Sequence, residues 1–241
     1  MKAQNYADHP GLPGRAFKPG GGRNAARAAL LAFCSFAALI LCGTPSRAQE
    51  SRIVARDANG AFYSVSSRYN NRNEYLHISK MGRDGSMLWE ANYDTGLDEK
   101  PVGMVANSGG LVILAATRTG NDRSFSLIYY SFDNFLIRET PGNTPSAVPV
   151  AMASDKQDNI YIALTAKKAN RSRAELWKFD RGGAFFWSAV YEPVGNAYAQ
   201  DVQTLYNGEI TFGVTESGGS NTFGEYAPLA LIYNANGARL R

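Results

Sequence analysis

The sequence is poor in cysteine. Its only two cysteines, Cys34 and Cys42, lie within the first 48 residues. Without that segment no disulfide, no thioether haem attachment and no cysteine-based metal site is available. The remaining 193 residues must therefore be stabilised by burial of apolar side chains, which a chain of this length can provide.

Histidine is scarce as well. His77 is the only histidine after residue 48, and no nucleophile-elbow pentapeptide accompanies it, so we interpret it as structural and expect neither a Ser-His-Asp site nor a transition-metal site. We expect no cofactor. Calcium stays open as an alternative, because several turns carry oxygen ligands, namely Asp57, Asn59, Asp84, Asp155 and Asp158.

No apolar run is long enough to anchor the chain permanently in a membrane. Five basic residues precede an apolar run of 14 residues at 28–41, which is shorter than the roughly 20 that a spanning helix needs. Small residues at Ser46 and Ala48 then match the positions read by signal peptidase. We predict a secretory signal at 1–48, cleavage after Ala48 and a periplasmic or secreted product. The long segment before the apolar run leaves the true start codon open.

A large net charge is also missing once the signal is set aside. The first 48 residues hold six of the 25 Lys and Arg and one of the 21 Asp and Glu, which leaves 19 basic and 20 acidic residues. The overall charge therefore gives no reason to expect nucleic-acid binding.

What the sequence does contain is a repeat. Four similar segments begin at intervals of 50, 49 and 49 residues, namely Gly60–Ser67, Gly110–Thr117, Asn159–Ala166 and Gly208–Thr215. In each unit, runs rich in β-branched and aromatic residues alternate with turns rich in Asp, Asn and Gly, as in antiparallel hairpins. We predict an all-β domain at 49–241 with units near 50–97, 98–146, 147–196 and 197–241, each a four-stranded antiparallel sheet.

The second strand of the units indicates how the sheets are arranged. The segments 111–116 and 160–164 are apolar on both faces, whereas a sheet with one wet face would alternate. Such strands lie between two other layers, as in a β-propeller, where every blade is packed between neighbours. A single β-sandwich is the alternative, although it does not require a 49-residue repeat.

The turn and core residues resemble a known family. The segments 158–165 and 176–183, followed by Trp187, are similar to bacterial β-propeller repeats of the SBBP type, and the first unit repeats the theme around Trp89. The second unit departs from it at Asn134, where a turn glycine is expected, and the fourth reaches residue 241 as its last strand should begin. The resemblance implies a propeller fold and no particular activity.

The repeated aromatic residues have two interpretations. Trp89 and Trp187 lie 98 residues apart, which suits either packing between sheets or stacking on a sugar. We favour packing, and extend that interpretation to Phe132, Phe179 and Tyr233, which occupy equivalent positions in the third strands.

Basic residues concentrate in the loops between the second and third strands, which lie on one rim in a propeller. We predict a binding patch for an anionic polysaccharide or protein surface, formed by Arg68, Arg72, Arg118, Arg123, Lys167, Lys168, Arg171 and Arg173. Acidic residues expected on the same rim, Asp94, Asp98 and Glu99, would partly cancel it.

The sequence thus predicts an exported, non-catalytic binding or scaffold module. A secreted hydrolase of a polymer or lactone, using carboxylates on the axial strands, is the competing class. A third alternative is that the chain is a fragment or one protomer of a larger propeller, such as a homodimer that completes the ring.

Overall fold

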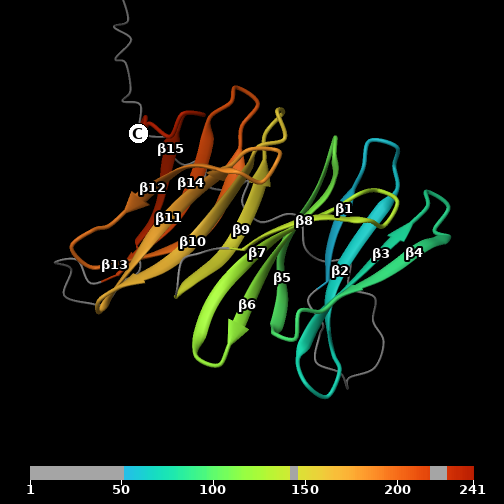
Figure 1. Ribbon diagram of the computed structural model, residues 1–241. Helices are drawn as coiled ribbons and strands as arrows, with labels where there is room; N and C mark the ends of the chain where they lie inside the picture. Colours follow the sequence, from blue (N-terminus) through green and yellow to red (C-terminus); the bar gives the residue numbers. More distant parts are fainter. Residues whose placement is uncertain (1–51, 142–145, 218–226) are drawn as a thin grey trace, which may run out of the picture. The chain divides into compact units, whose positions relative to one another are not determined.

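The structure is a computed structural model that describes residues 52–141, 146–217 and 227–241 (Figure 1). Within these ranges the regular structure consists of strands alone. The predicted signal segment and its cleavage site after Ala48 lie outside the described residues. In the described part of the chain, no helix has the length and apolar character needed to cross a bilayer.

Fifteen strands follow one another within the described ranges. Sheet 1 contains β1 (Ile53–Arg56), β2 (Phe62–Tyr69), β3 (Glu74–Met81) and β4 (Met87–Tyr93). Sheet 2 contains β5 (Asp98–Asn107), β6 (Gly110–Thr119), β7 (Asp122–Tyr130) and β8 (Leu136–Pro141). Sheet 3 contains β9 (Ala147–Ser154), β10 (Ile160–Lys168), β11 (Arg171–Phe179) and β12 (Phe185–Tyr191). Sheet 4 contains β13 (Asn196–Thr204), β14 (Ile210–Ser217) and β15 (Ala227–Tyr233).

Within each sheet, strands that follow one another in the sequence pair antiparallel, which confirms the all-β, propeller-like prediction of four repeated units. The expectation of four strands per unit holds for three sheets and is wrong for the fourth, which has three. After β15 the chain turns and pairs only briefly with it, through a bridge between Tyr233 and Arg239 and hydrogen bonds that join Ile232 to Leu240 and Arg241.

The hairpin turns depend on short polar side chains and on left-handed backbone. Asp57 Oδ1 accepts a hydrogen bond from the Ala61 amide at 2.9 Å, and Asp155 Oδ1 does the same for Asn159 at 2.9 Å. Asn134, which replaces the expected glycine, has a φ of 70°, a conformation that asparagine tolerates better than most residues. The repeated Asp and Asn residues are therefore explained by turn formation.

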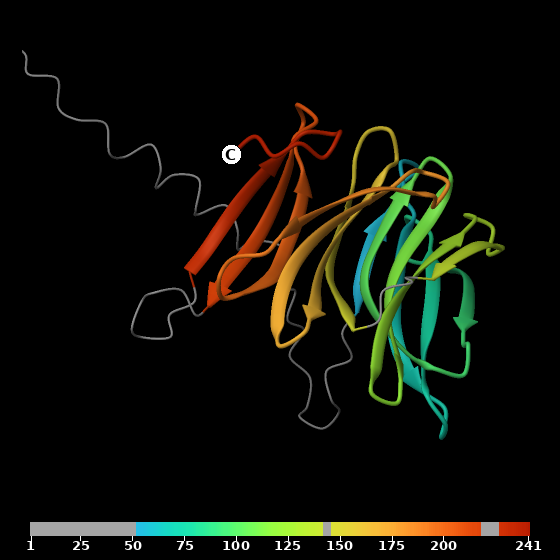
Figure 2. The ribbon, with the colours of Figure 1, turned by 60° about the vertical axis from the view of Figure 1, so that its left-hand side comes forward.

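The four sheets contact one another in chain order (Figures 1 and 2). Strands of sheet 1 pack on β5, strands of sheet 2 on β9, and strands of sheet 3 on β13, so that each sheet meets the first strand of the next. Among the described residues, no strand pair between sheets 1 and 4 makes contacts comparable with these. Sheets 2 and 3 are therefore the two that have a neighbour on each face.

Three apolar cores fill the spaces between successive sheets. The middle strands of sheets 2 and 3, β6 and β10, are buried on both faces over most of their length, as the sequence predicts. In β14 of sheet 4, by contrast, buried and half-buried residues alternate. Each fully buried Leu or Ile contributes about 1.5–3 kcal/mol.

A pair of clamps fixes sheet 1 to sheet 2 and sheet 3 to sheet 4. In the first, Trp89 Nε1 and Lys80 Nζ both donate to the Phe132 carbonyl, at 3.0 and 2.9 Å. In the second, Trp187 Nε1 and Lys178 Nζ both donate to the Ala235 carbonyl, at 3.1 and 2.9 Å. Each tryptophan also packs against an apolar core.

The aromatic residues of the repeat are thus packing residues. Trp89 and Trp187 lie 6.1 Å from the equivalent Tyr63 and Tyr161, ring centroid to ring centroid, with the same interplanar angle of 59°. Phe179 and Tyr233 end the third strands of their sheets and are buried, whereas the placement of Phe132 in a third strand is wrong: it lies beyond the end of β7 and packs partly buried against the first core. Because the clamp occurs in alternate sheets, the structural repeat is 98 residues, or two sheets.

Candidate binding surface at the hairpin ends

The eight predicted basic residues lie at three hairpins, β2–β3, β6–β7 and β10–β11, which turn at the lower end of their sheets in Figure 1. Residues in left-handed conformation make the three turns, Asn71 (φ 68°), Gly120 (φ 59°) and Ala169 (φ 53°). Seven of the eight basic side chains are exposed and Arg173 is half-buried. Strand register decides which of them meet.

Five of the eight face the boundary between sheets 2 and 3. Side chains alternate along a strand, so Arg118 lies on the face of β6 that carries Val112 and Leu114 in the core between these sheets. Arg123 is its cross-strand partner on β7. On β11, Arg173 shares the face of Trp177, which packs into the same core. Lys168 and Arg171 are paired with each other on this face of sheet 3.

The other three basic residues lie apart from this group. Arg68 shares a face with Ser64 and Ser66, opposite to the face of β2 that packs on sheet 2. Arg72 lies in the turn and helps to lower the pKa of Asp94, after the larger effect of the hydrogen bond from the Asn73 side chain. Lys167 is on the face of β10 that packs on sheet 4.

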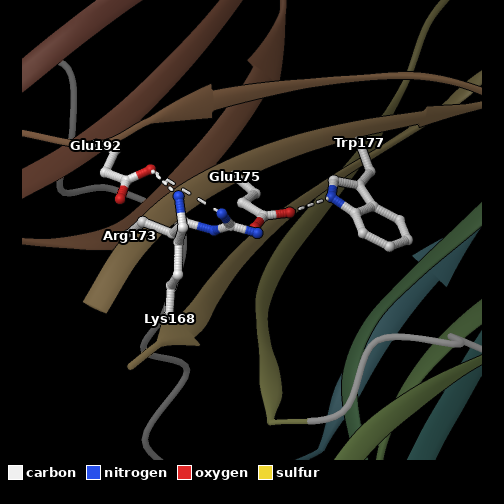
Figure 3. Close-up of polar contacts among 5 residues, drawn as sticks. All are labelled: Lys168, Arg173, Glu175, Trp177 and Glu192. Atoms are coloured by element: carbon white, nitrogen blue, oxygen red, sulfur yellow. Dashed lines mark hydrogen bonds and ion pairs between the residues drawn. The ribbon is translucent and has the colours of Figure 1, made fainter. Parts of the chain in front are cut away.

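Two of the basic residues belong to an ion-pair network (Figure 3). Lys168 Nζ lies 3.3 Å from Glu192 Oε2, and Arg173 Nη1 lies 4.0 Å from the same oxygen. Arg173 Nε contacts Glu175 Oε1 at 2.6 Å, while Trp177 Nε1 donates to Glu175 Oε2 at 2.7 Å. Glu175 is only 3% exposed, so both its oxygens are satisfied by the protein itself. Lys168 and Arg173 are thereby largely neutralised.

Arg118 and Arg123 border a cavity of about 330 Å³. The cavity lies where sheets 1, 2 and 3 meet, and ten residues line it: Glu74, Asp98, Lys100, Ala116, Thr117, Arg118, Arg123, Ser124, Val148 and Pro149. Lys100 Nζ pairs with Glu74 Oε2 at 3.2 Å, and Arg118 Nε donates to the Gly120 carbonyl at 2.8 Å. Within the described residues, no ion pair joins a carboxylate to Arg118 or Arg123.

Two further cavities lie at the opposite ends of the sheets. One of about 270 Å³ is bordered by Asn107, Asp158 and Arg181, and Asp158 is occupied by a hydrogen bond from the Ser108 hydroxyl. The other, of about 580 Å³, contains Lys156 Nζ stacked 3.3 Å from the centre of the Tyr206 ring. In each of them one charged turn side chain, Asp158 in the first and Lys156 in the second, is already engaged.

The turn carboxylates considered for calcium are used in hydrogen bonds. Asp155 accepts from Asn159 and from the Tyr161 hydroxyl, the latter at 3.0 Å. Asp57 accepts from the Tyr63 hydroxyl at 2.9 Å. Burial alone would raise the pKa of Asp57, but hydrogen bonds from Tyr63 and from backbone amides hold it below its usual value. In the described ranges, no three His, Cys, Asp or Glu side chains group as metal ligands would.

His77 fits the structural interpretation. Its Nδ1 lies 2.9 Å from Asn92 Oδ1, and its Nε2 lies 3.4 Å from Glu90 Oε1. The buried serines of the same sheet face, Ser64 and Ser79, hydrogen bond to each other at 2.8 Å. The imidazole is therefore held by an amide and a carboxylate, and it activates neither serine.

Part of this surface was not identified from the sequence. Glu175 and Arg173 lie two positions apart on one strand, which places their opposite charges on the same face of the sheet. This spacing in the sequence could have predicted their ion pair. Glu74 and Lys100 come from different sheets, and no local pattern brings them together. Asp98 was expected on this rim, and it accepts a hydrogen bond from the Glu74 amide at 3.0 Å.

The fold and the surface define an all-β, propeller-like protein with a mixed-charge cavity at one end of its sheets. No protein-family model matches the chain, and no curated protein matches it. Among solved structures, it is similar to MPT-4, a mannose phosphorylase from Leishmania mexicana in complex with phosphate ion, with 10% identity over 80% of this chain and 70% of that chain. The TM-score is 0.45, so the likeness carries no functional inference.

Proposed function

We propose that the protein is an exported, non-catalytic binding module that holds an anionic polysaccharide or an acidic protein surface at its hairpin ends. The observation that carries this proposal is the pair Arg118 and Arg123, which are exposed, adjacent across β6 and β7, and joined to no carboxylate of the described residues. Arginine in such a position binds carboxylate or phosphate groups through two parallel N–H bonds.

Binding is favoured over hydrolysis by the chemistry of the carboxylates. Glycoside hydrolysis requires two carboxyl groups free to face one substrate bond. Glu175, the most buried carboxylate of the hairpin ends apart from Glu99, is held by Arg173 and Trp177. In the cavity Glu74 is paired with Lys100 and Asp98 holds a backbone amide. Cationic groups outnumber the anionic ones there, as a site for an anion requires.

Retention on a polyanionic resin in a salt gradient tests the proposal. The variant R118S/R123S/K167S/K168S should elute at clearly lower salt than the natural chain, because exposed charge attraction is screened by salt. A double variant of the opposite ends, R83S/R181S, is compared with R118S/R123S to control for the change in net charge, since Arg83 and Arg181 are exposed turn residues. Unchanged retention of the quadruple variant would refute the proposal.

A further inference from the structure

The cavity beside Arg118 and Arg123 carries a charge balance suited to one negative charge. Three cationic side chains, Lys100, Arg118 and Arg123, face two anionic ones, Glu74 and Asp98, which leaves one unit of positive charge. A cavity of about 330 Å³ lies at the small end of the range for small-molecule sites, about 300–1,000 Å³. It therefore suits a single small unit with one anionic group.

The two arginines indicate where that group binds. They lie directly opposite each other in the β6–β7 register, where like charges destabilise a sheet, and Asp98 lies opposite Arg118 on the β5 side and offsets part of this repulsion. An anion between the two guanidinium groups would remove the repulsion. Arg118 is already oriented by its bond to the Gly120 carbonyl, so less side-chain freedom is lost when the anion binds.

The two carboxylates of the cavity indicate the rest of the ligand. Glu74 and Asp98 would repel a densely charged anion, but each can accept hydrogen bonds from hydroxyl groups. Asp98 is held in place because it accepts the Glu74 amide at 3.0 Å. Val148 and Pro149 of β9 supply an apolar wall, of the kind that contacts the carbon face of a sugar ring.

We infer that this cavity binds a uronic acid unit of a polysaccharide, with the carboxylate between Arg118 and Arg123 and the hydroxyl groups toward Glu74 and Asp98. The inference rests on the proposed function and narrows it to one site and one ligand class. The other exposed basic residues of the hairpin ends, Lys167, Arg171 and Arg72, then have the lesser role of attracting the polysaccharide by their charge.

Calorimetric titration of the full chain with trigalacturonate tests the inference. The natural chain should bind it, and R118S/R123S should bind at least about tenfold more weakly, since each lost charged hydrogen bond is worth about that factor. R83S/R181S should bind as the natural chain does. Methyl-esterified trigalacturonate, which has the same rings without the charge, should not bind. Thermal unfolding of each variant establishes that it is folded.

Two single substitutions separate this recognition from general charge attraction. R123K keeps the positive charge but loses the planar guanidinium group that can form two hydrogen bonds to one carboxylate. It should weaken trigalacturonate binding several-fold. D98N removes a negative charge while keeping an oxygen for the Glu74 amide. It should weaken trigalacturonate binding through the lost hydroxyl acceptor, whereas mere attraction would make it bind more tightly. A tighter D98N complex would overturn the inference, and so would equal affinity for hexaglutamate, which carries carboxylates without sugar hydroxyls.

The failure of this inference is distinguishable from the failure of the proposed function. If R118S/R123S binds trigalacturonate as the natural chain does, while the quadruple variant still loses retention on the polyanionic resin, the cavity site is wrong and anion binding at the rim stands. If the quadruple variant keeps full retention, the proposed function fails, and this inference fails with it.

Discussion

The boundary between sheets 2 and 3 differs from the other two sheet boundaries. Sheets 1 and 2, like sheets 3 and 4, are joined by a tryptophan and a lysine that share one carbonyl acceptor, Phe132 in one case and Ala235 in the other. Between sheets 2 and 3, Phe125 and Trp177 pack edge to face with centroids 5.8 Å apart, beside the buried Glu175.

The described chain is therefore a tandem of two sheet pairs. Residues that recur every 98 positions, such as Tyr63 and Tyr161, build the pairs. Arg118, Arg123 and Glu175 lie at the boundary where the pairs join, and they have no counterparts among the clamp residues. Residues that do not recur at this joint are therefore the best candidates for function.

The largest effect is expected when a clamp is removed. Trp89→Ala and Trp187→Ala should each lower the free energy of unfolding by about 2–3 kcal/mol, because each loses partly buried aromatic area and a hydrogen bond. Leu88→Ala, on the strand of Trp89 and 54% exposed, should change it by less than about 0.5 kcal/mol. Urea unfolding measures all three variants. If Trp89→Ala were as mild as Leu88→Ala, the clamp would not stabilise its sheet pair, and unequal losses for Trp89→Ala and Trp187→Ala would show that the two clamps are not equivalent.

A somewhat smaller effect is expected at the joint. Glu175→Leu should cost about 2 kcal/mol, since it leaves Arg173 with only its 4.0 Å contact to Glu192 and Trp177 Nε1 without an acceptor. The double variant Arg173→Leu/Glu175→Leu should recover about half of that loss, because replacing a buried pair by apolar residues is often nearly neutral. Urea unfolding of the single and the double variant measures both free-energy changes. A double variant less stable than the single one would contradict this expectation, and would show that Arg173 stabilises the joint through contacts other than Glu175.

The repeated architecture could be predicted from the sequence because its causes are local. Turn residues such as Asp155 mark where one strand ends and the next begins. The run of β10, apolar on both faces, indicates that this strand lies between two layers. The fourth sheet also departs from the four-stranded pattern at the place that the sequence indicates, beyond the turn that contains Gly237.

The candidate site could be predicted only in part, because it depends on register and on contacts between sheets. A basic hairpin is visible in the sequence, but the pairing of Arg118 with Arg123 follows from the length of the β6–β7 turn. The neutralisation of Lys168 by Glu192, 24 positions along the chain, follows from how β12 ends. The first relation depends on which residues form the turn, and the second has no local signature.

The turns that receive the clamps should differ from each other. Gly237 has a φ of 83°, and a Cβ there would lie 2.9 Å from Trp187 Cδ2. Gly237→Ala should therefore cost about 1–2 kcal/mol through backbone strain and displacement of the indole. Asn134→Gly, at the equivalent turn of sheet 2, should change stability by less than about 0.5 kcal/mol, because Asn134 already adopts a φ of 70°. Thermal unfolding compares the two, and an equal loss would mean that the turns are interchangeable.

The smallest effect concerns alkaline pH at the boundary of sheets 3 and 4. Burial, together with a hydrogen bond to Glu216, raises the pKa of Tyr191 to about 12 from the ordinary 10.0. Because the folded-state pKa is the higher one, the associated stability is fully present below pH 10 and is lost as pH rises toward 12. Solvent screening keeps this contribution to the free energy of unfolding below about 1 kcal/mol. The stability difference between the natural chain and Tyr191→Phe, followed by urea unfolding from pH 9 to 12, should shift by that amount in favour of Tyr191→Phe. A constant difference would show that the Tyr191 hydroxyl does not ionise differently in the folded and unfolded states.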